Sequence, residues 1–499
     1  MTGRARWWAL TAVSLATLMS YLDNNVINVA LPTIQHSLHL SVSGLEWIVS
    51  SYLLVLGGLL LVGGRIADVY GRRRIFLLGL AIFTLSSLAA GLSGSGAELI
   101  AARAVQGLGA ALVMPASLAI IAATFTNARE RTAAIGIWGA VGALGLALGP
   151  AIGGLVSQHL HWGWIFLINV PIGVVTLAIA VPFISESHGR TEGGTSLDIP
   201  GLVTSAAGLF ALTYALIEGG DKGWTSTLIL ASFGVAAVFA AAFLVIESRS
   251  EHPMVPLGLF RSAVFSGGLG TMMIWSFGVL GIYFFTSLYL QGNLGFSPTK
   301  AGLAFVPMAL CLAAAAVLSP QVTARIGSHR TVALGMAIMT VGLVLFARLG
   351  AGATFSDLLP GFILFGVGAG LMNVPLTNAV LGGAPASQAG IASALLNASR
   401  EIAGLLGVTV IGAVLRTREG SSLRAGSNPA QAFIDGYHSG LWLTIILLAA
   451  GVVLSYLSLR GRPEPAGVPA EDAEAALLDP ESVPIAVPEA RPADGSAVR

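Results

Sequence analysis

Apolar runs of about twenty residues recur along almost the whole chain, separated by short polar segments. Of its 499 residues, 55% are hydrophobic and only 10% are charged, unlike any soluble globular domain. A helix needs about 20 apolar residues to cross the hydrocarbon core of a lipid bilayer. The sequence therefore predicts an all-α integral membrane protein with about fourteen membrane-spanning helices. The net charge of +1 does not indicate nucleic acid as a partner.

Polar linkers divide the predicted spans into three groups. Six spans precede the linker 185–198, two lie between it and a second linker ending at Arg261, and six follow. The basic N-terminus runs directly into an apolar segment without a cleavage site, so we expect an uncleaved first span. The last residues are rich in Pro, Ala and Glu, which is typical of disorder. The expected parts are an N-terminal six-helix bundle over 1–184, linkers and two inserted helices over 185–261, a C-terminal six-helix bundle over 262–460 and a disordered cytoplasmic tail over 461–499.

The sequence repeats itself between the two predicted bundles. Residues 69–84 (VYGRRRIFLLGLAIFT) resemble residues 325–340 (RIGSHRTVALGMAIMT), and a Gly-x-Gly pair before a proline recurs at 107–115 and 366–375. Parallel half-repeats are expected of two-bundle transporters. The two spans between the linkers have no counterpart in this repeat. We interpret them as an insertion that serves packing, lipid contact or partner contact.

Arginine is concentrated in alternate loops. Most arginines, from Arg65 to Arg330, fall on the side that would also hold both termini, whereas the opposite short loops contain little beyond Lys222 and Lys300. The positive-inside rule then predicts a protein of the cytoplasmic membrane with both termini in the cytoplasm. Residues 416–440 contain three arginines and disagree with this pattern, as the longest expected outer loop.

Two ionisable residues lie within predicted spans, where a charge is costly and therefore marks a functional candidate. Asp23 lies past the middle of the first span, and a carboxyl in a low-dielectric cavity can exchange a proton near neutral pH. Arg103 lies near the start of the fourth span, and its permanent charge can control the protonation of a nearby acid. We hypothesise that the two are coupled. A structural carboxylate and an arginine reaching for the membrane edge are the alternatives.

The fifth predicted span contains the sequence GLALGPAIGG. Glycines four residues apart form a stripe without side chains, where a neighbouring backbone can approach closely. A proline removes a backbone donor and favours a kink. We therefore expect a hinge or a tight helix seam at Gly145, Gly149, Pro150, Gly153 and Gly154.

The loop between the second and third spans reads GRIADVYGRRR. Its glycines permit a tight turn, and its aspartate can pair with an arginine or cap a helix. We interpret Gly64, Asp68, Gly71, Arg72 and Arg74 as a conformational motif, while topogenic charge alone also explains the arginines.

Amide and aromatic side chains within the spans suit the walls of a cavity for apolar or cationic guests. Ordinary packing is the alternative for the aromatic residues. We interpret Glu46 and Glu218 as solvated charges at helix ends, and Arg400 with Glu401 as a pair at the membrane interface. The candidate cavity residues are Asn24, Asn25, Asn28, Gln106, Trp275, Tyr283, Tyr289, Gln291, Asn373 and Asn397.

The sequence contains no Walker loop, no His/Cys cluster with metal-site spacing and no evident nucleophile–base set. We therefore expect no metal, no cofactor and no enzymatic activity. An ion gradient is the expected source of energy for any work the protein does.

Together these motifs resemble the major facilitator superfamily, in particular its fourteen-span drug:proton antiporter branch (EmrB/QacA type). GRIADVYGRRR is similar to the superfamily's signature loop, and GLALGPAIGG to its antiporter motif. LDNNVINVALP resembles the first-helix motif around Asp23, and RAVQGLGAA the proton-transfer motif around Arg103. Two positions depart from the pattern, since Asn25 stands where threonine is usual and Gly163 where arginine is usual.

The resemblance implies an alternating-access antiporter, functional as a monomer, that exports drugs or other small amphipathic compounds in exchange for protons. Export of an endogenous metabolite or a self-made antibiotic is an alternative, and proton-coupled import is a further one. The motifs do not identify the compound.

Overall fold

Helices make up the regular structure of the residues that the computed structural model describes, which are 3–189, 198–250, 253–350, 352–385 and 388–461. The elements are α1 (Gly3–Leu38), α2 (Val42–Tyr70), α3 (Arg72–Gly91), α4 (Gly96–Thr124), α5 (Ala128–His159), α6 (Trp164–Leu167), α7 (Asn169–Phe183), α8 (Ile199–Lys222), α9 (Thr227–Arg249), η1 (Leu257–Arg261), α10 (Ala263–Leu288), η2 (Tyr289–Asn293), α11 (Pro298–Ala304), α12 (Val306–Ile326), α13 (Ser328–Phe346), α14 (Phe355–Gly382), α15 (Ala389–Arg424), α16 (Pro429–Ser458) and η4 (Leu459–Gly461).

Among the described residues, 13 helical segments are long and apolar enough to cross a membrane. Three of these segments combine two elements each: α6 with α7, α10 with η2, and α11 with α12. Helix α1 is not among the 13, because Asp23 and several amides interrupt its apolar surface, yet its 36 residues are ample for a span. The 13 segments together with α1 agree with the prediction of about fourteen spans in an all-α membrane protein.

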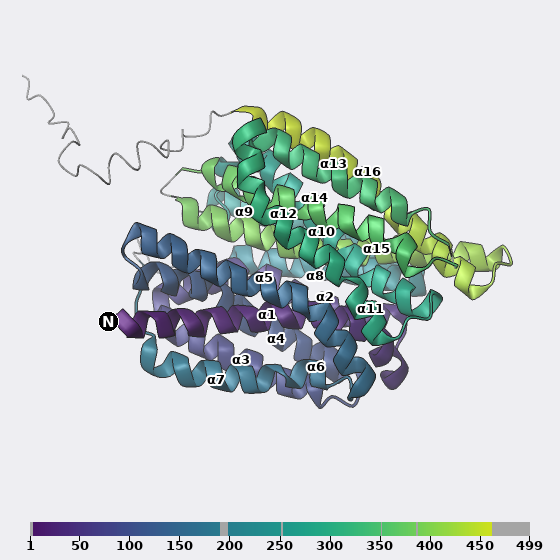
Figure 1. Ribbon diagram of the computed structural model, residues 1–499, viewed down its shortest axis with the longest axis horizontal. Coiled ribbons are helices and arrows are strands. Elements are labelled where there is room, and N and C mark those ends of the chain that lie inside the picture. The colour runs from purple at the N-terminus through teal and green to yellow at the C-terminus, as the bar shows by residue number, and fades with distance from the viewer. Residues whose placement is uncertain (1–2, 190–197, 251–252, 351, 386–387, 462–499) are drawn as a thin grey trace, which may run out of the picture. The chain divides into compact units, whose positions relative to one another are not determined.

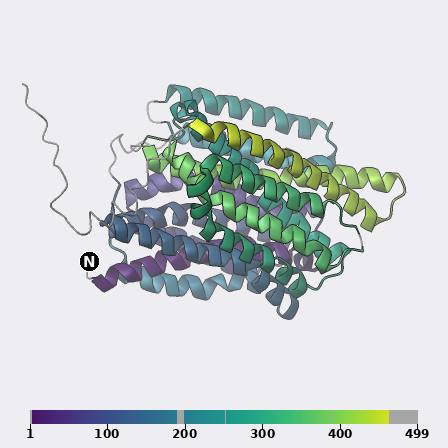
Figure 2. The same ribbon diagram turned by 45° about the horizontal axis from the view of Figure 1, so that its top comes forward.

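Helix α1 begins, and helix α16 ends, at the same end of the helix bundle, which we call the terminus end (Figures 1 and 2). The opposite end, where α1 ends at Leu38, is the far end. Residues 1–460 form one compact unit, so the boundaries predicted between the two bundles stay a prediction. Apart from Gly461, the predicted tail over 461–499 lies outside the described residues, as does Arg190 in the first linker.

The sequence repeat corresponds to a repeat in backbone geometry. Gly71 directly follows α2 with φ +106° and Gly327 directly follows α12 with φ +82°, values that favour glycine because it lacks a Cβ. One helix further, Gly79 of α3 lies against the carbonyl of Gly109 in α4, and α13 packs on α14 in the same way. The two related regions of sequence therefore build the same helix–turn–helix unit.

The two inserted helices α8 and α9 form a hairpin that packs mainly through α8 against α2 and α15. Helix α2 belongs to the first half of the chain and α15 to the second, so the hairpin lies beside the seam between the halves. Helix α8 continues to Lys222 and α9 to Arg249, several residues beyond Ile217 and Val245, where the apolar runs predict that these spans end. Glu218 is consequently inside a helix rather than after one.

The prediction of a long outer loop over 416–440 is wrong. Helix α15 continues to Arg424 and α16 begins at Pro429, so only the residues between them form a turn. Arg416 therefore lies within a helix, where it forms a buried ion pair with Glu46. Arg416, one of the three arginines that disagree with the positive-inside rule, is thus neutralised inside the protein, whereas Arg418 and Arg424 are exposed.

Gly335 provides a test of the close helix contact in the second half. A Cβ added there would lie 2.7 Å from the Gly368 carbonyl oxygen and 2.8 Å from Met372 Cβ. Gly335→Leu should therefore force α13 and α14 apart and lower the free energy of unfolding by about 1–3 kcal/mol. The midpoint of thermal unfolding in detergent measures this. Gly234→Leu is the control, because a Cβ at Gly234 meets nothing within 4 Å, and equal midpoints for the two variants would contradict the close contact.

Candidate functional site

A fully buried ion pair joins α1 to α4. The Arg103 guanidinium donates through Nη1 to Asp23 Oδ2 at 2.5 Å, and neither side chain is exposed. The sequence suggested a coupling between these two residues, and the structure places them in direct contact. A charge pair without access to water costs free energy unless its remaining hydrogen-bonding groups are also satisfied.

Two amides complete the hydrogen bonding of the aspartate. Gln106 Nε2 and Asn169 Nδ2 each donate to Asp23 Oδ1 at 2.8 Å. Gln106 also accepts from Arg103 Nη1 at 2.7 Å and donates to Ser87 Oγ at 2.7 Å. Both carboxylate oxygens of Asp23 therefore face donors, an arrangement that suits the ionised form of the side chain.

Aromatic side chains and one backbone carbonyl surround the guanidinium. The Tyr52 ring centroid lies 4.2 Å from Arg103 Cζ, and that of Phe166 lies 5.7 Å from it. Arg103 Nε donates to the Ile48 carbonyl at 3.4 Å, while its Nη2 atom has no hydrogen-bond partner within the described part of the chain. Contacts with aromatic faces stabilise a cation that water does not reach.

Local sequence explains how the helices place this cluster. Arg103 and Gln106 are three residues apart on α4 and so share one face. Asn169 is the first residue of α7, directly after the interruption that separates α6 from α7. Sequence reasoning missed Asn169, Ser87 and Tyr52 as members of the site. Only Asn169 gave a signal, as an amide within the motif WGWIFLINVPIG over 162–173, the segment of the resemblance in which Gly163 departs from the family pattern.

The same motif explains one departure from the family pattern. A Cβ at Gly163 would meet the Gly91 carbonyl oxygen, and a Cβ at Gly91 would lie 2.8 Å from the Gly163 carbonyl oxygen. The backbones of the α3 end and the turn before α6 thus meet where glycine is the only residue that fits.

The glycine stripe of α5 packs against α1 beside the ion pair. A Cβ at Gly145 would lie 2.8 Å from the Leu18 carbonyl oxygen, and one at Gly149 would lie 2.6 Å from Asn25 Cβ. Gly153 faces the Val26 carbonyl in the same way. Helix α5 is one continuous element across Pro150, and these contacts form the tight seam that the glycine spacing predicts.

The C-terminal part of the glycine–proline motif contacts the second half of the chain. A Cβ at Gly154 would lie 3.0 Å from Thr299 Cα, and Gly302 lies against the Pro150 carbonyl. Thr299 donates through its backbone N–H to Gln158 Oε1 at 3.1 Å and through its hydroxyl to the Gly154 carbonyl at 3.2 Å. One helix therefore combines a seam within the first half and a contact between the halves.

The GRIADVYGRRR motif forms a one-residue turn at Gly71 between α2 and α3. Arg72 donates through Nε to Asp68 Oδ1 at 2.9 Å and through Nη1 to the Ala119 carbonyl of α4 at 3.4 Å. Glu186, which follows α7, accepts from the backbone N–H of Arg74 at 3.2 Å. Gly64 lies against Pro115 of α4. These contacts fasten the turn to neighbouring elements of the first half.

The structure does not bring the ten candidate cavity residues into one place. Tyr283 stacks on Phe305 with centroids 4.8 Å apart, and Tyr289 stacks on Tyr437 at 5.0 Å, so that both tyrosines pack inside the second half. Gln291 instead joins the halves by donating to the Val29 carbonyl at 2.9 Å. Asn25, Asn28, Gln106, Tyr283 and Tyr289 are buried, whereas Asn24, Trp275, Gln291, Asn373 and Asn397 are half-buried.

Glu46 is not the solvated helix-end charge that the sequence suggested. It is fully buried and pairs with Arg416, whose Nη2 also donates to the carbonyls of Leu216 at 3.2 Å and Ile217 at 2.9 Å. This far-end cluster therefore joins α2, α8 and α15. Glu218 lies nearby, accepting from Trp47 Nε1 at 2.9 Å.

Arg400 and Glu401 lie well inside α15 rather than at its end. They pair with each other at 3.0 Å, and Arg400 Nη2 also donates to the Tyr21 hydroxyl of α1 at 3.0 Å. This pair therefore contacts the first half of the chain through Tyr21, which lies two residues before Asp23 in sequence.

In the described part of the chain, fourteen helical segments long enough to span a membrane, a repeated helix–turn–helix unit and a charge pair buried between spans together define a multi-pass membrane transporter. The chain belongs to the Major Facilitator Superfamily, whose family model matches residues 13–408.

Relatives of known role are similar over most of this chain. The puromycin resistance protein of Streptomyces alboniger is 35% identical over 461 residues, covering 90% of this chain and 89% of its own. The multidrug resistance protein Stp of Mycobacterium tuberculosis is 36% identical over 438 residues, covering 86% and 81%. The fold resembles the crystal structure of a bacterial homologue of the human lysosomal transporter Spinster, with a TM-score of 0.64 and 19% identity over 93% of this chain and all of that one.

The ion pair should contribute to stability in a way that depends on both partners. Arg103→Met leaves the Asp23 charge buried without an opposite charge, which should lower the free energy of unfolding by about 3–5 kcal/mol. Adding Asp23→Asn should restore much of that loss, because no unpaired charge then remains. Unfolding in detergent of the two single variants and the double variant measures the coupling. Additive losses would contradict a direct interaction.

Proposed function

We propose that this transporter exports drugs or other small amphipathic compounds across the cytoplasmic membrane in exchange for protons. The observation that supports this most is the buried Asp23–Arg103 pair, because the Asp23 carboxylate is the charge in that cluster that a proton can neutralise. Protons, rather than a bound cofactor, supply the energy, and a single chain suffices for the cycle.

The geometry suggests how a proton acts on the helices. While Asp23 is ionised, Arg103, Gln106 and Asn169 hold α1 against α4 and α7. A proton on Asp23 removes its charge and weakens these bonds. Helix α1 is then released from α4, and its seam with the glycines of α5 transmits the movement to the contact with α11. Protonation thus favours one arrangement of the two halves over the other.

The terminus end is the cytoplasmic end in this proposal, since Arg72, Arg74 and Arg129 lie there. At the far end the halves are joined by the bonds of Gln291 and Thr299 and by the far-end cluster. Toward the terminus end of α5, by contrast, a Cβ at Gly136 or Gly139 would meet nothing within 4 Å. These features support a state that is closed outside and accessible from the cytoplasm, as an exporter needs for loading.

One proton provides enough energy for useful export. A charge moving through about 150 mV yields roughly 3–4 kcal/mol. At one-to-one exchange this supports a concentration ratio on the order of a few hundredfold for a neutral compound.

The names of the relatives support resistance compounds as the substrate class. A membrane carrier confers resistance by removing a compound from the cell, which agrees with export rather than import. A dedicated exporter of one antibiotic is the second candidate, because the puromycin resistance protein is named for one compound whereas Stp is named for many. An efflux assay over a panel of compounds distinguishes broad from single specificity.

Replacing the proton-binding group tests the coupling. Asp23→Asn keeps the shape and accepts hydrogen bonds but cannot titrate, so uphill efflux of an exported compound should be abolished. Arg103→Lys keeps the charge but loses the planar guanidinium that donates through Nη1 to Asp23 and through Nε to the Ile48 carbonyl, so it should also fail or nearly fail. Efflux from cells or vesicles with normal amounts of inserted protein measures both. Undiminished uphill efflux by Asp23→Asn would remove Asp23 as the proton carrier.

The far-end cluster should hold the outer side closed. Glu46→Gln removes its charge, and the outer side should open more often, which raises labelling of a cysteine at Thr299 by a membrane-impermeant maleimide at least about tenfold. The assay uses a Cys311→Ala background, because Cys311 is the only cysteine.

Glu98→Gln is the matched control for this assay, since Glu98 is an exposed carboxylate at the same end. It should leave the labelling rate unchanged. Equal rates for Glu46→Gln and the unaltered background would contradict the role of the cluster in closing the outer side.

A further inference from the structure

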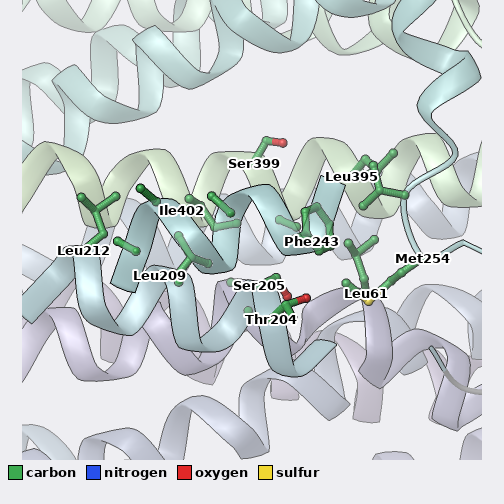
Figure 3. A pocket seen from close by; sticks show the side chains of 18 of the residues that line it. Leu61, Thr204, Ser205, Leu209, Leu212, Phe243, Met254, Leu395, Ser399 and Ile402 are labelled. Carbon is green, nitrogen blue, oxygen red and sulfur yellow. The ribbon is translucent and has the colours of Figure 1, made fainter. Parts of the chain in front are cut away.

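A cavity of about 560 Å³ lies where the inserted hairpin packs against the remaining helices (Figure 3). Residues of α8 and α9 line one side, and residues of α2 and α15 line the other. The segment after α9 contributes Met254, Val255 and Phe260 at the terminus end. The volume is within the range of pockets that hold small molecules.

The chemistry of the lining indicates an apolar occupant. Among the described residues that line the cavity none is charged, and the side-chain hydroxyls are those of Thr204, Ser205 and Ser399. Thr204 donates to the Pro200 carbonyl at 2.8 Å and Ser205 to the Leu202 carbonyl at 3.0 Å. Since these two hydroxyls are already bonded within α8, the cavity offers few partners to water or to a polar ligand.

The cavity is long and runs parallel to the helices. Its lining residues on α9 extend from Phe233 to Phe243, which is about 15 Å at the helical rise of 1.5 Å per residue. Figure 3 shows the lining side chains distributed from Leu212 to Met254 along the helix direction. Small residues make the space, and a Cβ at Gly58 would meet nothing within 4 Å. An acyl chain of a membrane lipid has this shape and orientation.

Basic residues lie at the terminus end of the cavity. Arg249 ends α9, and Arg261 follows the lining residue Phe260. Both arginines are exposed. Arginine at the end of a membrane span attracts the headgroups of anionic lipids.

We propose that the cavity holds one acyl chain of an anionic phospholipid whose headgroup contacts Arg249 and Arg261. One wall of the site is the contact between the two halves, where a Cβ at Gly57 would lie 3.1 Å from Ile402 Cγ1. The bound chain therefore stabilises the arrangement in which α2 and α15 meet. This site is independent of the transported compound and of the direction of transport.

Photo-crosslinking of the full chain in phosphatidylcholine vesicles tests the proposal. The probe is a small fraction of phosphatidylglycerol that carries a diazirine in one acyl chain. Mass spectrometry should locate crosslinks on the lining residues of α8, α9 and α15. Ala240→Leu fills the cavity and should lower this labelling about tenfold, because about two methylene groups lose their burial.

Ala241→Leu is the matched control, since Ala241 is exposed, neighbours Ala240 and does not line the cavity. It should leave the labelling unchanged. Crosslinks spread evenly over the lipid-facing surface, or crosslinks that survive Ala240→Leu, would overturn the proposal. Labelling of the same residues by a photoreactive exported compound, with no lipid crosslink, would overturn it as well.

A second comparison tests the headgroup contact. The same diazirine on phosphatidylcholine should label the cavity severalfold less than on phosphatidylglycerol, and Arg249→Ala with Arg261→Ala should remove the difference. Arg325→Ala, at an exposed arginine of the same end, should preserve it. Equal labelling by the two lipids in the unaltered protein would overturn the anionic headgroup assignment.

Discussion

The ion pair between Asp23 and Arg103 is the interaction on which the remaining structure depends. Neither side chain reaches solvent, and charges within a membrane protein are retained only where partners replace the water they lose. Three helices supply those partners, since Gln106 shares α4 with the arginine, Asn169 begins α7 and Tyr52 lies on α2, while Ser87 of α3 accepts a hydrogen bond from Gln106. The polar centre of the first half is thus a constraint on how its helices pack, and any change in the charge of Asp23 acts on all of them.

Glycine contacts connect this centre to the boundary between the halves. Gly149 of α5 lies against Asn25, two residues from Asp23, while Gly154 on the same helix lies against Thr299 of the second half. A continuous helix that is tightly packed at both places moves as one body. Helix α5 is therefore the physical link between protonation and the closure of the far end in the proposed cycle.

Sequence patterns within single helices predicted the membrane spans and the buried charges of this protein. Contacts between side chains on different helices could not be predicted in this way. Apolar length gave the spans, and the rarity of charge within them gave Asp23 and Arg103. Asn169 escaped notice because an amide at a helix start is common and its distance from Asp23 is a property of the fold. Glu46 and Arg416 are 370 residues apart; each was interpreted alone, as a helix-end or loop charge, although each neutralises the other.

The inserted helices are a second case in which contacts between helices could not be predicted from the sequence. Their apolar sequence and lack of a repeat partner suggested packing or lipid contact, but the cavity beside them arises only where α8 and α9 meet α2 and α15. Tyr283 and Tyr289 looked equally suitable for a cavity and instead stack within the second half. Residue type indicates what a side chain can do, while the fold decides what it faces.

Exchange of a proton on Asp23 for the exported compound is the central claim, and calorimetry measures it directly. Binding of an exported compound is measured over a series of pH values in buffers of different ionisation enthalpy, which gives the number of protons released per compound bound. The account predicts a maximum of about one proton released by the unaltered protein and none by Asp23→Asn, with binding retained. Binding without proton release at any pH, or equal release by Asp23→Asn, would contradict it.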